Sequence, residues 1–122
     1  MNEKRSYPRI EGNLALKLCA SDCDLVTETK NISASGAYCA VNRKIEPMTK
    51  LDMVLLVPLI SKVNHKNVKK INCKGVVVRS DYIQDNGKQS YCLGIYFSEI
   101  KETDRRILSA YINSLTKPSN IF

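Results

Sequence analysis

The chain has 122 residues, with 19 lysines and arginines against 12 acidic residues, so its formal net charge is +7. This length predicts one domain with a real hydrophobic core, and the positive surplus favours an anionic partner such as a nucleotide, a nucleic acid or an acidic membrane. The longest apolar run, Met53 to Ile60, contains Pro58 and is far shorter than the roughly 20 residues of a membrane-spanning helix.

Several kinds of protein are disfavoured by what the sequence lacks. The N-terminal segment is charged and has no apolar stretch like that of a secretory signal peptide, so we expect a cytoplasmic protein. The five cysteines are odd in number and form no Cys-x-x-Cys spacing, which predicts free thiols and, with His65 as the one histidine, no metal site. The sequence shows no paired carboxylates, nucleophile–base set or glycine-rich phosphate loop, so neither an enzyme nor a cofactor is expected.

The first predicted element is a polar and basic arm at residues 1–12. After it, apolar and polar residues alternate, as at residues 14–18, which is the pattern of half-buried strands. Residues 61–70 are predicted to form a lysine-rich loop, and Asn86-Gly87 predicts a tight hairpin turn. The predicted strands are residues 14–19, 25–33, 37–41, 51–57, 71–80 and 91–97.

Near the C-terminus the apolar residues change to helical spacing, which predicts an amphipathic helix from about residue 103 to 116. Thr103 is its expected N-cap, and Pro118 follows its end. About six antiparallel strands followed by one helix predict a small barrel or strongly curled sheet on which the helix packs. We therefore expect a domain at residues 13–116 and a tail at 117–122. The apolar stripe consists of Ile107, Leu108, Tyr111, Ile112 and Leu115.

The first candidate binding motif is Arg5-Ser-Tyr-Pro-Arg9. Pro8 favours an extended backbone here, and the two guanidinium groups each offer a rigid fork of donors. Such a fork can bind a phosphate or the O6/N7 edge of guanine. The alternative is an ordinary solvated basic arm.

The second candidate motif is Asn31-Ile-Ser-Ala-Ser-Gly36. Residues two apart in a strand share a face, so Asn31 and Ser33 are expected to point the same way while Ile32 points into the core. An amide beside a hydroxyl can read the polar edge of a purine, and Gly36 permits a close backbone approach or a positive φ. The alternative is a strand that simply ends in a turn.

Together, the two motifs resemble the signature of the PilZ domain, in which RxxxR is followed by [D/N]xSxxG. The rest of the chain is similar to this family in the same order. The matching segments are a hydrophobic strand ending at Pro58, Lys74-Gly-Val-Val-Val-Arg79, Gly94-Ile-Tyr-Phe97 and the helix near 103–116.

The resemblance implies a six-stranded antiparallel barrel with a C-terminal helix, without catalytic activity, that binds the bacterial second messenger cyclic di-GMP. By the same resemblance, Arg5 and Arg9 hold phosphates and guanine edges or faces. Asn31, Ser33 and Gly36 hold one guanine on the barrel surface.

Three positions depart from the family pattern. Asn31 stands where Asp is commoner, which removes a negative charge that would accept from guanine. Lys4 precedes the first motif arginine, a position that influences whether one ligand or a pair of ligands binds. A glycine that the family often has before the strand at 51–57 has no counterpart in Met48-Thr-Lys50, which we interpret as loop variation.

The resulting hypothesis is a stand-alone receptor, monomeric or dimeric, that binds cyclic di-GMP and signals by a conformational change to an unidentified protein partner in trans. Motility, pili, biofilm exopolysaccharide and virulence are the candidate processes. The alternative is a PilZ-fold interaction module that binds no ligand, and a general nucleic-acid binder is disfavoured because basic and aromatic residues do not interleave. The basic segment 62–79 is either solvated or a docking surface, and Tyr38 and Tyr96 are interpreted as packing or rim residues.

Overall fold

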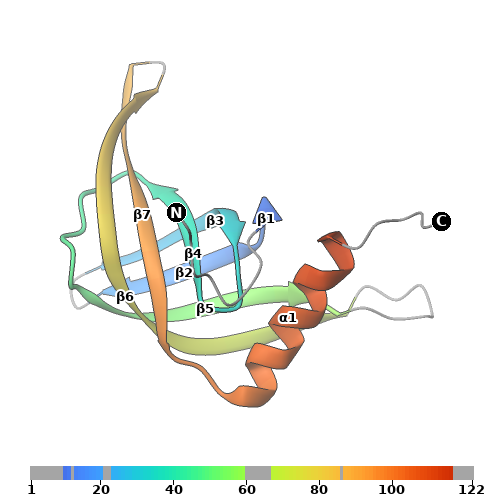
Figure 1. The fold of residues 1–122 in the computed structure, drawn as a ribbon. Helices are drawn as coiled ribbons and strands as arrows, with labels where there is room; N and C mark the ends of the chain where they lie inside the picture. Colours follow the sequence, from blue (N-terminus) through green and yellow to red (C-terminus); the bar gives the residue numbers. More distant parts are fainter. Residues whose placement is uncertain (1–9, 12, 21–22, 60–66, 86, 117–122) are drawn as a thin grey trace, which may run out of the picture.

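A computed structural model of the chain describes residues 10–11, 13–20, 23–59, 67–85 and 87–116 (Figure 1). These residues form strands up to Glu99 and a helix near the end of the chain. The elements are β1 Ile10–Glu11, β2 Ala15–Ala20, β3 Cys23–Ile32, β4 Gly36–Val41, β5 Lys50–Pro58, β6 Val68–Asp85, β7 Lys88–Glu99 and α1 Glu102–Thr116.

Six of the strands close into an antiparallel barrel. They follow the order β3-β2-β5-β6-β7-β4, and pairing of β4 with β3 closes the ring. The two-residue β1 pairs with the last residues of β3, with Ile10 opposite Ile32 and Glu11 opposite Asn31. The six-stranded antiparallel barrel with a C-terminal helix is thus confirmed, while β1 is an additional pairing within the segment predicted to be an arm.

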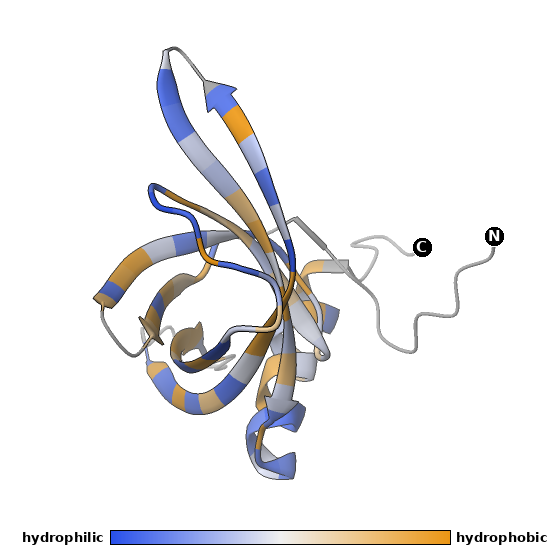
Figure 2. Cartoon of the chain, turned by 90° about the vertical axis from the view of Figure 1, so that its left-hand side faces the viewer, coloured by the Kyte–Doolittle hydropathy of each residue, from blue (hydrophilic) through white to orange (hydrophobic). Residues whose placement is uncertain are grey.

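The barrel interior follows directly from the alternation of the sequence. In β5, and in β2 as far as Leu18, every second side chain is buried, so one face of each strand lines the core and the other faces outward. Hydrophobic and hydrophilic residues accordingly alternate in colour along the strands in Figure 2. The same alternation in β4 buries Ala37, Cys39 and Val41. The largest fully buried side chains are Leu14, Leu16, Leu18, Ile32, Met53, Leu55, Val57, Ile71, Leu93, Phe97, Leu108 and Ile112.

Strands β6 and β7 form a long hairpin that rises beyond the barrel (Figure 1). They remain paired up to Asp85 and Lys88, because Gly87 takes a φ of 80° and so permits a two-residue turn. The strand predicted at residues 71–80 ends before this part of the hairpin, and the strand predicted at 91–97 begins after it. Edge-to-face packing of Tyr82 on Tyr91, with ring centroids 5.5 Å apart, supports the additional pairs.

Helix α1 begins at Glu102, one residue before the predicted N-cap, so Thr103 lies inside its first turn. Its apolar stripe packs against the barrel beside β5, where Leu108 and Ile112 are fully buried. The first turn contains Glu102 and Asp104, whose negative charges suit the positive end of the helix dipole. In the described part of the chain, no helix has the length and apolar character needed to cross a membrane.

Candidate functional site

A row of four residues crosses the outer face of the barrel. Asn31 on β3 lies opposite Tyr38 on β4, Tyr38 lies opposite Gly94 on β7, and Gly94 lies opposite Arg79 on β6. Directly opposed residues of neighbouring strands project to the same face of a sheet. Because the neighbours of Tyr38 in β4 are buried, this shared face is the outer one.

The row lies in a surface cavity of about 410 Å³, a size that suits a small ligand. The cavity contains the turn of the second motif as well as the row. Its lining consists of Asn31, Ser33, Ser35, Gly36, Ala37, Tyr38, Val78, Arg79, Gly94, Ile95 and Tyr96. A larger cavity of about 690 Å³ lies beside the start of α1 but contains no residue of either motif, so it is a weaker candidate.

The turn after β3 is held by Ser33. The Ser33 amide donates to the Gly36 carbonyl at 2.9 Å, and the Ser33 Oγ accepts from the Ser35 amide at 3.1 Å. The Ser33 and Ser35 hydroxyls also lie 3.0 Å apart. Ser33 is buried, so its hydroxyl shapes the turn more than it presents a group to solvent.

Gly36 is needed here because β4 approaches β7 closely. A Cβ atom at this position would collide with the backbone carbonyl of Ile95. Its φ is not positive, so of the two reasons predicted for glycine the close approach applies. The Ser35 carbonyl accepts from the Phe97 amide at 2.9 Å, which attaches the turn to β7.

The Asn31 side chain contains a hydrogen-bond acceptor without a partner among the described residues. Its Oδ1 is buried, and no hydrogen bond to it is found in the described structure. Leaving a buried acceptor unpaired costs about 1–3 kcal/mol, so such an atom is expected to find a partner in the working protein. An N–H donor of a bound molecule is a suitable partner.

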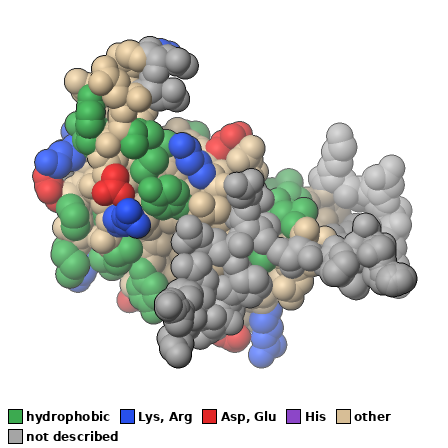
Figure 3. Space-filling view, turned by 45° about the horizontal axis from the view of Figure 1, so that its top comes forward, with side chains coloured by type: hydrophobic (Ala, Val, Ile, Leu, Met, Phe, Trp, Pro, Cys, Tyr) green, Lys and Arg blue, Asp and Glu red, His purple; other side chains and the backbone are tan. Residues whose placement is uncertain are grey.

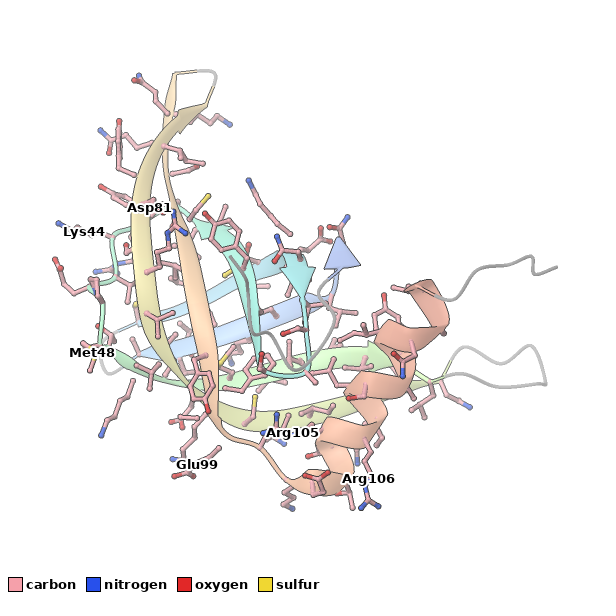
Figure 4. The ribbon with its side chains drawn as sticks, viewed as in Figure 1. Lys44, Met48, Asp81, Glu99, Arg105 and Arg106 are labelled. Carbon is pink, nitrogen blue, oxygen red and sulfur yellow. The ribbon has the colours of Figure 1, made fainter. Side chains whose placement is uncertain are left out.

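Arg79 reaches the cavity because of a bulge in β6. The pairing with β7 shifts between Val77 and Arg79, so Val78 is an extra residue and both Val78 and Arg79 are exposed on the outer face. The Arg79 Nε donates at 2.8 Å to the Oδ2 of Asp81, which is labelled in Figure 4. Gly94 lies between Arg79 and Tyr38, where an added Cβ would be 3.2 Å from the Arg79 Cβ.

The two tyrosines of the cavity differ in exposure. Tyr38 is half-buried, and burial, followed by the neighbouring Cys92 thiol, raises its pKa above the ordinary value, which keeps the phenol neutral. Tyr96 is 54% exposed and offers an apolar surface at the rim. Hydrophobic side chains with single basic and acidic groups among them appear on the face seen in Figure 3.

The predicted site residues divide into two sets. Asn31, Ser33 and Gly36 line one cavity. Lys4, Arg5 and Arg9 lie outside the described residues. Across those parts of the chain that the structure describes, no cluster of side chains could hold a metal ion.

Sequence reasoning assigned none of the other residues that line this cavity to a site, among them Arg79, Gly94, Tyr38 and Tyr96. Arg79 and Gly94 lie in segments interpreted only as strand patterns, and Tyr38 and Tyr96 were interpreted as packing or rim residues. The alternation of β4 and β7 does place Tyr38, Gly94 and Tyr96 on the outer face, so that signal was present. Their convergence on Asn31 depends on the strand register, which the sequence does not state.

Comparison with solved structures shows the same fold in several bacterial proteins. The Bacillus subtilis inhibitor of motility MotI (DgrA) shares 20% identity with a TM-score of 0.74, over 96% of this chain and 54% of that one. The MrkH–c-di-GMP complex from K. pneumoniae shares 15% identity with a TM-score of 0.70, over 93% of this chain and 53% of the MrkH chain. The PilZ domain of YcgR from Escherichia coli, with c-di-GMP, shares 14% identity with a TM-score of 0.65, over 96% of this chain and 95% of the YcgR domain.

This chain spans about half the length of the MotI and MrkH chains but nearly all of the YcgR domain. No curated protein matches it. The family model described as the PilZ domain matches residues 3–114, which is most of the sequence and includes the whole barrel and nearly all of α1. The chain therefore belongs to the PilZ domain family.

Proposed function

We propose that the chain is a cyclic di-GMP receptor whose ligand binds in the cavity on the outer face of the barrel. The observation that carries this proposal is the buried, unpaired Asn31 Oδ1 beside the Ser33–Gly36 turn. Membership of the PilZ family supports the choice of ligand. MrkH and the YcgR domain, which share the fold, were both solved with c-di-GMP.

Each motif residue has a role that its chemistry supports. The Asn31 Oδ1 accepts from the N1–H or N2–H of a guanine, and this contact removes the cost of an unpaired acceptor. Ser33 holds the turn, and Gly36 allows β4 to lie against β7. Arg5 and Arg9 bind phosphates and guanine edges, and Lys4 influences the number of ligands.

The link between Asn31 and the N-terminal segment supports these roles. Glu11 of β1 lies opposite Asn31, and Ile10 lies opposite Ile32. Arg9 directly precedes Ile10 in the sequence. The second motif arginine is therefore followed at once by the strand that pairs with β3 at Asn31.

We further propose that ligand binding changes the conformation read by a protein partner in trans. The turn that contacts the ligand is connected to α1, because the Arg105 Nη1 donates to the Ala34 carbonyl at 2.8 Å. A shift of this turn would therefore be transmitted to the helix. We propose that this receptor acts in the cytoplasm as a monomer or dimer. Control of motility or of biofilm-related processes fits such a function.

The test is isothermal titration calorimetry with cyclic di-GMP and with GTP as the control ligand. We expect saturable binding of cyclic di-GMP alone, loss of binding in Arg9→Ala, and a loss of roughly tenfold to hundredfold in Asn31→Ala. Asn72→Ala, which changes an exposed asparagine outside this cavity, is the matched control and should bind like the wild type.

The stability of Asn31→Ala separates a binding effect from a folding effect. Because the Asn31 Oδ1 is unpaired in this structure, its removal should not lower the free energy of unfolding through a lost hydrogen bond. A folded wild type that binds no cyclic di-GMP would contradict the proposal. The ligand-independent interaction module would then be the better description.

A further inference from the structure

We infer that Arg79 is a third ligand-binding guanidinium, which takes the acceptor edge of the guanine whose donor edge is bound by Asn31. We also infer that Asp81 competes with the ligand for Arg79. The inference rests on the proposed function, since it assigns a further specificity-determining residue to the same cavity. It adds a residue that lies in neither binding motif.

The position of Arg79 follows from the strand register. Asn31 and Arg79 are the two ends of the row across β3, β4, β7 and β6. With strands about 4.8 Å apart, three steps separate their Cα atoms by roughly 14 Å. Both residues line the same cavity, so a purine base bound there can lie between them.

The chemistry of the two ends is complementary to guanine. Asn31 presents an unpaired acceptor, which suits the N1–H and N2–H donors of this base. The opposite edge of guanine carries the O6 and N7 acceptors, which a guanidinium binds with two parallel hydrogen bonds. Adenine carries an amino donor where guanine has O6, so an arginine at this end favours guanine.

Gly94 and the bulge make this contact sterically feasible. The bulge at Val78 turns Arg79 to the outer face of β6. Gly94 adds no side chain of its own to the row, and an added Cβ would lie 3.2 Å from the Arg79 Cβ and 3.8 Å from the Tyr38 ring. Tyr38 therefore stands between Asn31 and Arg79, and a base bound between these two residues would lie over its ring.

Asp81 holds Arg79 only weakly. Its Oδ2 accepts from the Arg79 Nε at 2.8 Å, but the two side chains are 67% and 44% exposed. Exposed ion pairs contribute little net stability, so a ligand that offers two acceptors can displace the carboxylate. Asp81 therefore lowers the affinity of the site without blocking it.

The experiment is a titration of cyclic di-GMP into the wild type and four variants, with thermal unfolding to verify each fold. Arg79→Ala should weaken binding by roughly tenfold to hundredfold, and Arg79→Lys should restore little, because lysine lacks the planar fork. Asp81→Asn should tighten binding by up to about fivefold. Lys69→Ala, which removes one exposed positive charge from the same strand, is the matched control and should change little.

The outcomes distinguish this inference from the proposed function. If the wild type binds and Arg79→Ala binds as tightly as Lys69→Ala, the role of Arg79 is wrong while the receptor function stands. Full affinity in Arg79→Lys would show that charge alone matters and would overturn the edge-reading role. If the wild type binds no cyclic di-GMP, the proposed function fails and the inference fails with it.

Discussion

Met48 has a backbone conformation that glycine would adopt more easily. Its φ is 76°, in the left-handed region that favours glycine, and its side chain is 76% exposed. The Met48 amide donates to the Val77 carbonyl at 2.6 Å, and the Val77 amide donates to the Thr49 carbonyl at 2.9 Å. These bonds attach the loop to β6 directly before the bulge, so the backbone keeps its strained shape despite the methionine.

Replacing this methionine should therefore stabilise the fold. We expect Met48→Gly to raise the free energy of unfolding by about 0.5–1 kcal/mol, since the relief of steric strain exceeds the added entropy of the unfolded chain. Urea unfolding measures the change. Thr49→Gly, which introduces the same residue at a position without positive φ, should lower stability. A Met48→Gly variant less stable than the wild type would show that the exposed side chain makes contacts that matter.

Among the elements, α1 is connected to the candidate site through the Arg105 side chain. Arg105 is half-buried, and its Nη1 donates to the Ala34 carbonyl at 2.8 Å (Figure 4). Its neighbour Arg106 is exposed, and the Arg106 Nε lies 3.7 Å from the Glu102 Oε2. Ala34 belongs to the turn that Ser33 and Gly36 shape. The helix therefore fixes the turn as well as covering the barrel.

We expect Arg105→Leu to lower the free energy of unfolding by about 1–2 kcal/mol, because a partly buried carbonyl loses a charged donor. Amide hydrogen exchange should also become faster at Ser35 and Gly36. Arg106→Leu removes the same charge one position along the helix and should change stability by no more than about 0.5 kcal/mol. Equal effects of the two substitutions would show that the contact with Ala34 does not hold the turn.

The elements themselves were predictable to different degrees. The six barrel strands and the helix follow from apolar periodicity, because each strand buries one face and α1 buries one stripe. The two-residue β1 is too short to carry a period, and the additional pairs beyond Ser80 depend on cross-strand contacts such as Tyr82 with Tyr91. Local pattern does not report such pairings.

The site was predictable only in part, for a related reason. Asn31, Ser33 and Gly36 are close in sequence, so their motif alone brings them together. Arg79 joins them through three strand pairings and a bulge, and the register of those pairings is set by the closed barrel. Local sequence patterns therefore found one side of the cavity and missed the other.

On the scale of the whole molecule, barrel closure places thiols in the shared core. Burial raises the pKa of Cys39 from 9.0 to about 12. Burial, with a further contribution from the charge of Asp104, raises the pKa of Cys73 from 9.0 to about 11. At a pH between 9.0 and these raised pKa values, the two thiols keep their protons in the folded protein but have lost them in the unfolded chain. Alkaline pH therefore favours unfolding, whereas below pH 9.0 these thiols leave stability unchanged.

The free energy of unfolding should accordingly fall as pH rises from 9 towards 11, by up to about 1.4 kcal/mol per pH unit for each thiol. Urea unfolding of the wild type at a series of pH values measures this slope. A Cys39→Ala/Cys73→Ala variant will be less stable at neutral pH because it leaves cavities, but its stability should decline less steeply between pH 9 and 11. A slope equal to that of the wild type would show that the two thiols do not cause the alkaline loss. A smaller slope would show that closure of the barrel buries them as neutral groups.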